Sequence, residues 1–316
     1  MAEHALMQPK NLLARVPGVA VVLVILLVGF AFTPYFLSER NLTNILVQSV
    51  VLLLLALPMT IVIMTEGLDL SVGTVLTLAS IVLALVVVQT GSLVLALLAG
   101  LAVGAAFGAV NGWMVSSLGI PPFVATLGSL GAAQGLALVV SDGQSVTGIP
   151  SYVRTVYSGE LLGIDLPIWI GAAAFAAFWV LLYRTRFGTY VFALGGNREA
   201  LRLAGVPVRA MLIAVYTLSG TMAGLAALVM TARMNSGHPT AGVGLEFDAI
   251  AAVAVGGTSF EKGNGWLLGT LLGVFAIGVL RNGLNLMAIP SSVQVACIGV
   301  LVILALFFDG LKGGQG

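Results

Sequence analysis

Long apolar stretches follow one another along almost the whole chain, and charged residues stand mainly at the breaks between them. Stretches of about 17–25 apolar residues are long enough to cross the hydrocarbon core of a bilayer as helices. Hydrophobic residues make up 59% of the 316 and charged residues 8%, whereas soluble domains have roughly 45–50% and about 25%. The sequence therefore predicts an all-α polytopic membrane protein, with residues 1–316 in a single transmembrane domain.

About ten transmembrane helices are expected from these stretches, of which the eighth has the weakest pattern. They lie near 16–33, 45–64, 70–90, 92–118, 122–140, 166–183, 211–231, 245–260, 266–287 and 292–308. The first stretch follows Lys10 and Arg15 and shows no small-residue cleavage site before Thr33-Pro34. We therefore expect an uncleaved anchor rather than a signal peptide.

The distribution of Lys and Arg predicts the orientation in the membrane, because basic residues favour the cytoplasmic side. With both termini in the cytoplasm, nine basic residues lie inside: Lys10, Arg15, Arg184, Arg186, Arg198, Arg202, Arg209, Lys262 and Lys312. Four then lie outside or at the outer boundary: Arg40, Arg154, Arg233 and Arg281. The longest segment predicted outside is 141–165, which is either a docking surface for an extracytoplasmic partner or a solvated connection.

A polar segment at 184–210 interrupts the apolar stretches, and its centre has the signals of a short helix. Asn197 can accept the first free amide protons as N-cap, Gly205 can adopt a left-handed conformation, and Pro207 prevents continuation. We expect this cytoplasmic segment to meet a soluble protein, the alternative being a loop that only determines topology.

The charges and apolar residues of this short helix fit a docking role. Glu199 stands at the positive end of the helix dipole and Arg202 in the last turn. Leu201, Ala204 and Val208 are predicted to form an apolar edge, which suits a helix that inserts into a groove of another protein.

Two parts of the chain resemble each other. Asn111-Gly112 ends one glycine-rich stretch and Ile120-Pro121 follows, and Asn282-Gly283 and Ile289-Pro290 repeat this order. Spans two to five then correspond to spans seven to ten, and an offset of five helices predicts an inverted internal repeat, as in many transporters. Chance similarity between apolar segments is the alternative.

Glycines recur at intervals of four residues in several predicted helices. Small residues at this spacing let helix backbones approach closely in lipid. We therefore expect close helix packing at Gly100, Gly104, Gly108, Gly112, Gly220, Gly224, Gly265, Gly269 and Gly273.

Several kinds of chemistry are not expected. Cys297 is the only cysteine, and His4 and His238 belong to no metal-ligand cluster. The segment Gly256-Gly257-Thr258-Ser259 lacks the lysine of a phosphate-binding loop, so another chain would have to hydrolyse any nucleotide. A net charge of +1 gives no reason to expect nucleic acid. We expect no catalytic residue, metal or cofactor in this chain.

The ionisable residues of the apolar region stand at span ends. Glu66 and Asp69 precede the third span, Glu246 and Asp248 open the eighth, and Arg281 lies near the end of the ninth. This placement favours capping or gating over a proton relay, so an ion-coupled secondary transporter is the less favoured alternative. A membrane-embedded enzyme is weaker still, because no catalytic cluster is recognisable.

Uncharged polar residues are spread through the spans, where they can replace the water of a hydroxylated solute or join helices by hydrogen bonds. Phe123 and Trp113 could present ring faces to a sugar. The candidates for the translocation route or its gate are Asp69, Asn111, Phe123, Gln134, Asp248, Asn282 and Asn285.

Four motifs together resemble ribose-type ABC-transporter permeases. Glu66–Gly73 is similar to that family's GGIDLSVG stretch, and Gly195–Val206 is similar to its cytoplasmic GGNxxAARLSGI segment. Asp248–Ser259 resembles AIAAVVLGGTS, and Arg281–Leu286 contains NGLNL. The resemblance extends from about Asn41 to Asp309, with one departure, since Glu66 replaces a glycine.

The resemblance implies the membrane subunit of an importer for monosaccharides or related polyols in the bacterial inner membrane. It implies a second permease copy or paralogue, a cytosolic ABC ATPase that uses the ATP, and a periplasmic solute-binding protein. Alternating access would be driven through the cytoplasmic segment. The residues carried over for coupling to the ATPase are Gly196, Asn197, Glu199, Ala200, Arg202 and Gly205.

Overall fold

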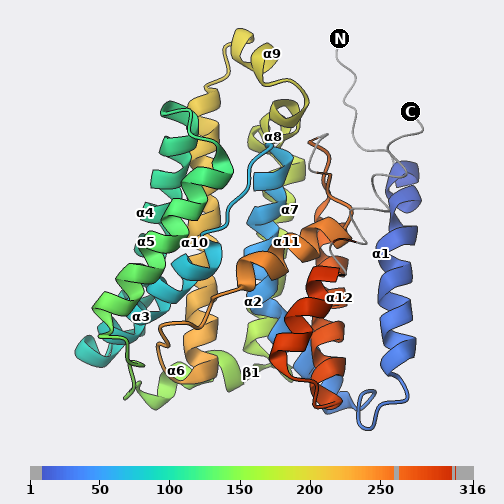
Figure 1. Cartoon of the computed structure of the whole chain (residues 1–316), viewed down its shortest axis with the longest axis vertical. Helices are drawn as coiled ribbons and strands as arrows, with labels where there is room; N and C mark the ends of the chain where they lie inside the picture. Colours follow the sequence, from blue (N-terminus) through green and yellow to red (C-terminus); the bar gives the residue numbers. More distant parts are fainter. Residues whose placement is uncertain (1–8, 260–262, 301–302, 304–316) are drawn as a thin grey trace.

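The structure is a computed structural model that describes residues 9–259, 263–300 and 303. It is a bundle of helices with one short hairpin (Figure 1). The elements are α1 (Pro9–Phe30), α2 (Glu39–Met64), α3 (Val72–Thr90), α4 (Leu93–Ser117), α5 (Pro122–Val140), α6 (Ser151–Ser158), β1 (Glu160–Leu161), β2 (Ile164–Asp165), α7 (Leu166–Arg184), α8 (Arg186–Gly196), α9 (Arg198–Leu203), α10 (Val208–Met234), α11 (Leu245–Val255) and α12 (Leu267–Leu286).

Seven described helices are long and apolar enough to cross a membrane, namely α2, α3, α4, α5, α7, α10 and α12. This confirms a polytopic helical membrane protein. Shorter apolar helices occupy Val19–Phe30 and Ser291–Val300. The eighth predicted span, 245–260, corresponds to α11, which has 11 residues and is too short to cross alone. The last, 292–308, extends beyond the described residues, so the count of ten helices stays a prediction.

Two crossings of the bundle begin with non-helical backbone that runs inward before a helix starts, and these two segments are here called re-entrant (Figure 1). After α2, residues 65–71 turn back inward and α3 begins inside the bundle. After α10, residues 235–244 run inward from the opposite end and lead to α11. The reversals need left-handed backbone, with φ of +58° at Glu66 and +50° at Asn235. Glycine adopts this conformation without cost. The GGIDLSVG stretch has a glycine where this chain has Glu66, and the left-handed backbone explains why a glycine suits that position.

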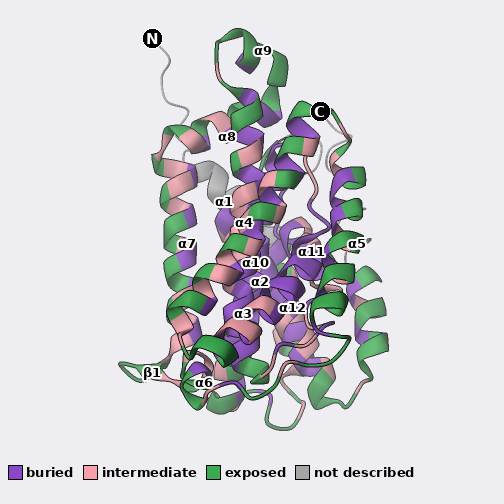
Figure 2. Cartoon of the chain, turned by 90° about the vertical axis from the view of Figure 1, so that its left-hand side faces the viewer, coloured by how far each residue is buried: buried purple, intermediate pink, exposed green. Residues whose placement is uncertain are grey.

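Helix α2 lies at the centre of the bundle (Figure 2). Its upper part is apolar on every side, and Leu54, Leu57 and Ile61 are completely buried. A helix that is apolar all round must be surrounded by protein or lipid. The flanking helices α7, α10, α11 and α12 all contact it, so α2 joins the two sides of the molecule.

The glycine pattern is explained by the contact between α4 and α10. A Cβ on Gly224 would lie 2.5 Å from the carbonyl oxygen of Gly100, and a Cβ on Gly112 would lie 2.5 Å from the Cα of Ile213. A Cβ on Gly104 would collide with the Gly220 carbonyl group. The two backbones are thus in direct contact, which confirms the predicted role of these small residues.

Candidate functional site

The short helix predicted in the polar segment is present as α9. The Asn197 side chain accepts a hydrogen bond from the amide of Ala200 at 2.8 Å and caps the helix. Gly205 has a φ of +81°, and α10 begins directly after Pro207. The cap, the left-handed glycine and the proline therefore act as predicted, because each depends on local chain chemistry.

Glu199 and Arg202 form a bidentate pair on the exposed side of α9. Arg202 donates from Nε to one carboxylate oxygen at 3.0 Å and from its terminal nitrogen to the other at 2.6 Å. These hydrogen bonds hold the pKa of Glu199 below its ordinary value. A pair exposed to this degree adds little to stability, so its place on the surface suits recognition better than folding.

The predicted apolar edge of α9 was wrong in two of its three residues. Leu201 and Val208 are buried against the chain's own body and anchor α9 to it. Ala204 is exposed. The large apolar side chain that points outward is Leu203, which is 78% exposed. The surface available to a partner therefore includes Leu203 and Ala204 beside the Glu199–Arg202 pair.

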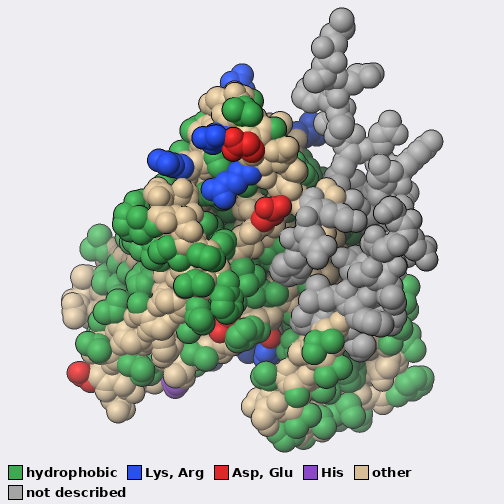
Figure 3. All heavy atoms as spheres, turned by 45° about the horizontal axis from the view of Figure 1, so that its top comes forward, with side chains coloured by type: hydrophobic (Ala, Val, Ile, Leu, Met, Phe, Trp, Pro, Cys, Tyr) green, Lys and Arg blue, Asp and Glu red, His purple; other side chains and the backbone are tan. Residues whose placement is uncertain are grey.

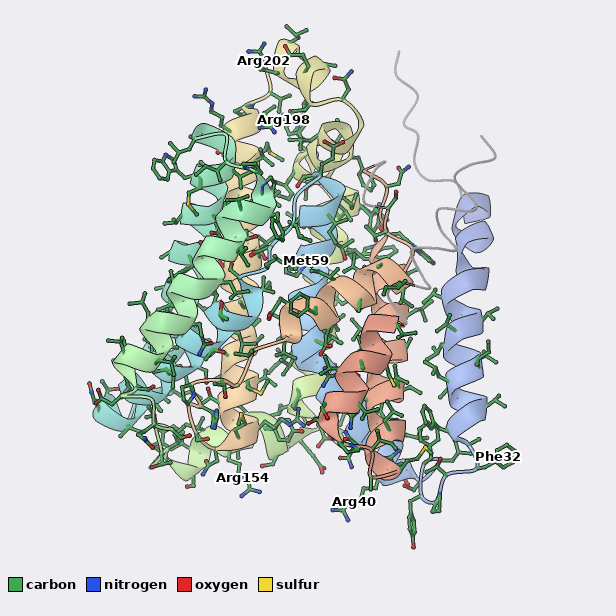
Figure 4. The ribbon with its side chains drawn as sticks, in the orientation of Figure 1. Phe32, Arg40, Met59, Arg154, Arg198 and Arg202 are labelled. Atoms are coloured by element: carbon green, nitrogen blue, oxygen red, sulfur yellow. The ribbon has the colours of Figure 1, made fainter. Side chains whose placement is uncertain are left out.

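The polar segment and the predicted outer segment lie at opposite ends of the bundle. Figure 4 shows Arg198 and Arg202 at one end, and Arg40 and Arg154 at the other. Basic side chains gather on the end that carries α9 (Figure 3). The segment 141–165, with α6 and the hairpin, lies at the opposite end (Figure 1).

The start of α3 holds a buried polar network. Asp69 accepts hydrogen bonds from the Ser71 amide at 3.0 Å, the Ser71 hydroxyl at 2.7 Å and the Ser219 hydroxyl at 2.8 Å. Asn111 donates to Ser71 at 2.9 Å and accepts from Ser129. Both carboxylate oxygens of Asp69 thus have partners inside the chain, and the network joins α3, α4, α5 and α10.

Two further candidates join helices at the end away from α9. Asn282 and Asn41 exchange two hydrogen bonds of 2.9 Å, which tie α12 to α2. Asn285 accepts a hydrogen bond from Gln294 at 2.7 Å. Asn282 and Asn285, like Asp69 and Asn111, thus form hydrogen bonds between segments of the chain. This is the alternative to solute contact that the sequence left open for polar residues in the spans.

An ion pair connects α11 to α12. Arg281 donates to Asp248 at 2.5 Å, and the Asp248 side chain is 5% exposed while that of Arg281 is 37% exposed. The Nε of Arg281 is buried without a partner among the described residues. The pair is therefore incompletely satisfied and open on the arginine side, in contrast to the Asp69 network.

The inward ends of the two re-entrant segments meet each other. Thr77 accepts a hydrogen bond from the Gly242 amide at 2.9 Å. The carboxylate of Glu246 accepts from the Gly244 amide at 3.1 and 3.2 Å. A Cβ on Gly73 would collide with Glu246 and with the Gly242 carbonyl. The starts of α3 and α11 are thus in backbone contact in the interior.

Phe123 and Gln134, both on α5, lie apart from the other candidates. Phe123 is 52% exposed in the first turn, and Trp113 of α4 is 49% exposed. Gln134 donates to the Pro239 carbonyl at 2.8 Å, and its carbonyl oxygen is buried without a partner among the described residues. The seven candidates for the route therefore belong to several separate clusters.

Five residues of these clusters were not among the seven predicted candidates for the route. Ser71, Ser129 and Ser219 complete the Asp69 network, Asn41 pairs with Asn282, and Glu246 lies between the two re-entrant segments. Four of them had a signal in the sequence: Ser71 stands two residues after Asp69, Glu246 is one of the acids at span ends, and Ser129 and Ser219 are polar residues within apolar spans. Asn41 had none. Among the described residues, His, Cys, Asp and Glu form no group that could hold a metal.

Comparison with known proteins gives consistent results. Residues 41–306 match the family described as "Branched-chain amino acid transport system / permease component". The ribose import permease protein RbsC of Escherichia coli K12 is 40% identical over 311 residues, 97% of this chain and 95% of the relative. RbsC of Bacillus subtilis 168 is 39% identical, with 92% and 90% covered. The D-allose transport system permease protein AlsC of Escherichia coli K12 is 36% identical, with 92% and 89% covered.

No solved structure matches the chain. The family and the relatives are described as permeases or permease components. This confirms the expectation of a transport subunit that is not itself an enzyme, and it gives no support to an ion-coupled carrier. The match covers the polar segment at 184–210, the re-entrant segments and both glycine-rich stretches. The chain belongs to the family of permease components described as the branched-chain amino acid transport system.

Proposed function

We propose that this chain is the membrane subunit of a bacterial inner-membrane importer for a monosaccharide or a related polyol. A separate cytosolic ATPase supplies the energy, and a periplasmic binding protein delivers the solute. The observation that carries this proposal is identity of 33–40% over nearly the full chain with permeases named for ribose, D-allose and L-arabinose.

The contact with the ATPase is assigned to α9 and its caps, Gly196, Asn197, Glu199, Ala200, Arg202 and Gly205. Leu203 and the Glu199–Arg202 pair face outward, and Leu201 holds the helix to the body. Because only four residues, Ala204 to Pro207, separate α9 from α10, a push on α9 reaches a bundle helix directly. One side of α9 packs on the chain's own body and the other is exposed. A helix that transmits movement from a partner protein to this chain needs both contacts.

The inverted repeat is supported by how the helices pair. Helix α4 packs on α10, and α12, its counterpart in the second half, packs on α2, the counterpart of α10. Likewise α3 packs on α4 and α10, whereas α11 packs on α12 and α2. Each half also contains one re-entrant segment, and the two enter from opposite ends (Figure 1). Exchange of the halves therefore preserves these pairings.

The meeting point of the re-entrant segments is the place proposed for gating. Asp248 and Arg281 form the incompletely satisfied pair beside it. At the end away from α9, Val146 and Gly237 exchange two backbone hydrogen bonds of 2.8 and 2.9 Å. A binding protein docked on 141–165 would thus touch a segment that leads straight to α11. Alternating access, with two permease copies, would relate movements at the two ends.

Orientation can be tested with single cysteines in a Cys297→Ser background. Position 199 should react with an impermeant thiol reagent only after cells are opened, whereas position 151, which is exposed at the other end, should react in intact cells. The start of α1 and α9 lie at the same end of the bundle (Figure 1), which supports a cytoplasmic N-terminus. Labelling of position 199 from outside would refute the orientation and the coupling role.

The transport function can be tested in vesicles that contain the permease, its ATPase and the binding protein. Uptake of the sugar that the binding protein retains should require ATP inside and should persist when ion gradients are dissipated. Glu199→Ala and Arg202→Ala should lower solute-stimulated ATP hydrolysis, with Arg154→Ala at the other end as matched control. Uptake driven by an ion gradient without ATP would overturn the proposal.

A further inference from the structure

The hairpin before α7 exposes a leucine where the backbone disfavours one. Strands β1 and β2 pair antiparallel, Glu160 with Asp165 and Leu161 with Ile164, so Leu162 and Gly163 form a two-residue turn. Both have left-handed backbone, with φ of +56° and +76°. Such turns favour Asn-Gly or Asp-Gly, because leucine is strained at a positive φ.

The tip is also unusually exposed. Leu162 is 86% exposed, Leu161 52% and Ile164 42%. An asparagine at position 162 would suit both water and the turn better than leucine does. Neither the backbone nor the packing of the chain explains the leucine, so its reason must lie in what surrounds the hairpin.

Two features place the hairpin at the edge of a bilayer. The Trp169 indole, in the first turn of membrane-spanning α7, donates a hydrogen bond to the Leu161 carbonyl at 3.1 Å. Tryptophan is enriched at the boundary between membrane and water. In Figure 2 the hairpin extends sideways past α7, away from the bundle axis. A sideways tip at this level meets lipid.

A groove next to the hairpin fits the same partner. A cavity of about 250 Å³ lies between α2, α7 and α12, and its wall begins at Ile168, beside Trp169. Gly171 and Phe175 continue the wall along α7, and the lining is almost entirely apolar. An acyl chain that starts under the hairpin could follow this groove, since long apolar chains fill such surfaces.

We propose that the 160–165 hairpin is a lipid anchor, whose tip Leu161–Leu162 inserts among phospholipid headgroups while an acyl chain occupies the groove between α2, α7 and α12. This proposal rests on the proposed function in one respect only, since the proposed orientation assigns the hairpin to the outer leaflet of the membrane. Lipid contact at this end would stand or fall independently of orientation and substrate.

The test uses the full chain in vesicles of phosphatidylethanolamine and phosphatidylglycerol. In a Cys297→Ser background, Leu162→Cys and the exposed control Ser151→Cys carry an environment-sensitive fluorophore. We expect a blue-shifted emission at 162, quenched several-fold more by a lipid with a nitroxide near the headgroup than at 151, and quenched less by aqueous iodide. Equal iodide quenching at both positions, without lipid quenching at 162, would overturn the proposal.

Two other outcomes would also overturn it. Protection of position 162 only after addition of the binding protein would assign the tip to that protein. Energy transfer between labels on two copies would assign it to a second permease. As a check on folding, Leu162→Asn should keep or raise the thermal stability in detergent, because asparagine suits the turn. The same variant should lose much of the gain in stability that the native chain shows on transfer from detergent to lipid, and an unchanged gain would count against the anchor.

Discussion

Gly224 and Gly100 face each other across the contact between α4 and α10, yet alanine should have opposite effects at the two positions. A Cβ on Gly224 would lie 2.5 Å from the Gly100 carbonyl oxygen and 2.9 Å from the Leu101 Cα, whereas ordinary contacts begin at 3.4 Å. The helices would have to separate by roughly 0.9 Å, the difference between 3.4 and 2.5 Å. A Cβ on Gly100 meets nothing nearer than 3.5 Å, so no movement is needed.

The two variants share one energy term and differ in another. Replacing glycine by alanine inside a helix favours the helix by about 1 kcal/mol at either position. Overpacking costs about 1–3 kcal/mol, and it applies only to Gly224→Ala. Its cost should be near the upper end, because the atoms met are backbone and cannot change rotamer. We therefore expect Gly224→Ala to be about 2–3 kcal/mol less stable than Gly100→Ala.

The measurement is unfolding of both variants in the same detergent, followed by far-ultraviolet circular dichroism during titration with dodecyl sulfate. Gly100→Ala should unfold at the same or a higher dodecyl sulfate fraction than the native chain, and Gly224→Ala at a lower one. If the two variants unfold together, or if Gly224→Ala is the more stable, the backbone contact between α4 and α10 is not as close as described. Both outcomes are informative because each variant adds one methyl group to the same interface.

Three further predictions concern the ends of the bundle and the gate. Asn197→Ala should cost about 1 kcal/mol of local helix stability and weaken ATPase stimulation, whereas Asn197→Asp should keep both, as measured by amide exchange and ATP hydrolysis. Asp248→Asn should destabilise the chain by about 1–3 kcal/mol, less than a fully buried pair because Arg281 is partly exposed. Adding Arg281→Gln should restore part of that loss in the same unfolding titration, and a purely additive loss would contradict the pairing. Because its folded pKa is lowered by Arg202, Glu199 should help to order α9 at neutral pH and lose this effect as the pH falls through that lowered pKa. Amide exchange in α9 should therefore show greater protection at neutral than at acidic pH, after correction for the intrinsic rate.

Features of α9 that depend on a few neighbouring residues could be predicted, and features that depend on the rest of the molecule could not. The Asn197 cap and the Gly205 turn follow from local hydrogen bonding and backbone freedom. Which side of the helix faces the body depends on what packs beneath it. Six residues are too few to show a hydrophobic period, so Leu201 and Leu203 could not be assigned to opposite sides from the sequence.

Hydrophobicity also cannot distinguish a helix that crosses the membrane from one that only enters it. Leu245–Val255 is as apolar as a crossing helix, but it begins after a re-entrant segment and ends at Val255. The left-handed Gly244 before it and Gly257 after it mark the true limits. Length together with flanking glycines was the available signal, and the 16-residue estimate for 245–260 already fell short of a full span.

The candidate route was predicted from residue type, and residue type is compatible with two different roles. An amide or carboxylate in a lipid-embedded chain either meets solute or satisfies another protein group. Asn111 and Asn282 turned out to have protein partners. The hydrogen-bonding partner of Asn282 is Asn41, which lies 241 residues away in the sequence. No local pattern could therefore have identified the pair.

The contrast between satisfied and unsatisfied polar groups indicates which parts can move. The Asp69 network and the glycine contact between α4 and α10 are fully enclosed, so separating them would expose several unpaired groups and forfeit backbone packing. These parts should move together as a rigid unit. The Asp248–Arg281 pair is open on one side and already has an unpartnered Nε. Opening this pair would leave fewer groups newly unpaired than opening the Asp69 network, because Arg281 is already partly exposed. A push on α9 that is carried through α10 would therefore be released where α11 meets α12.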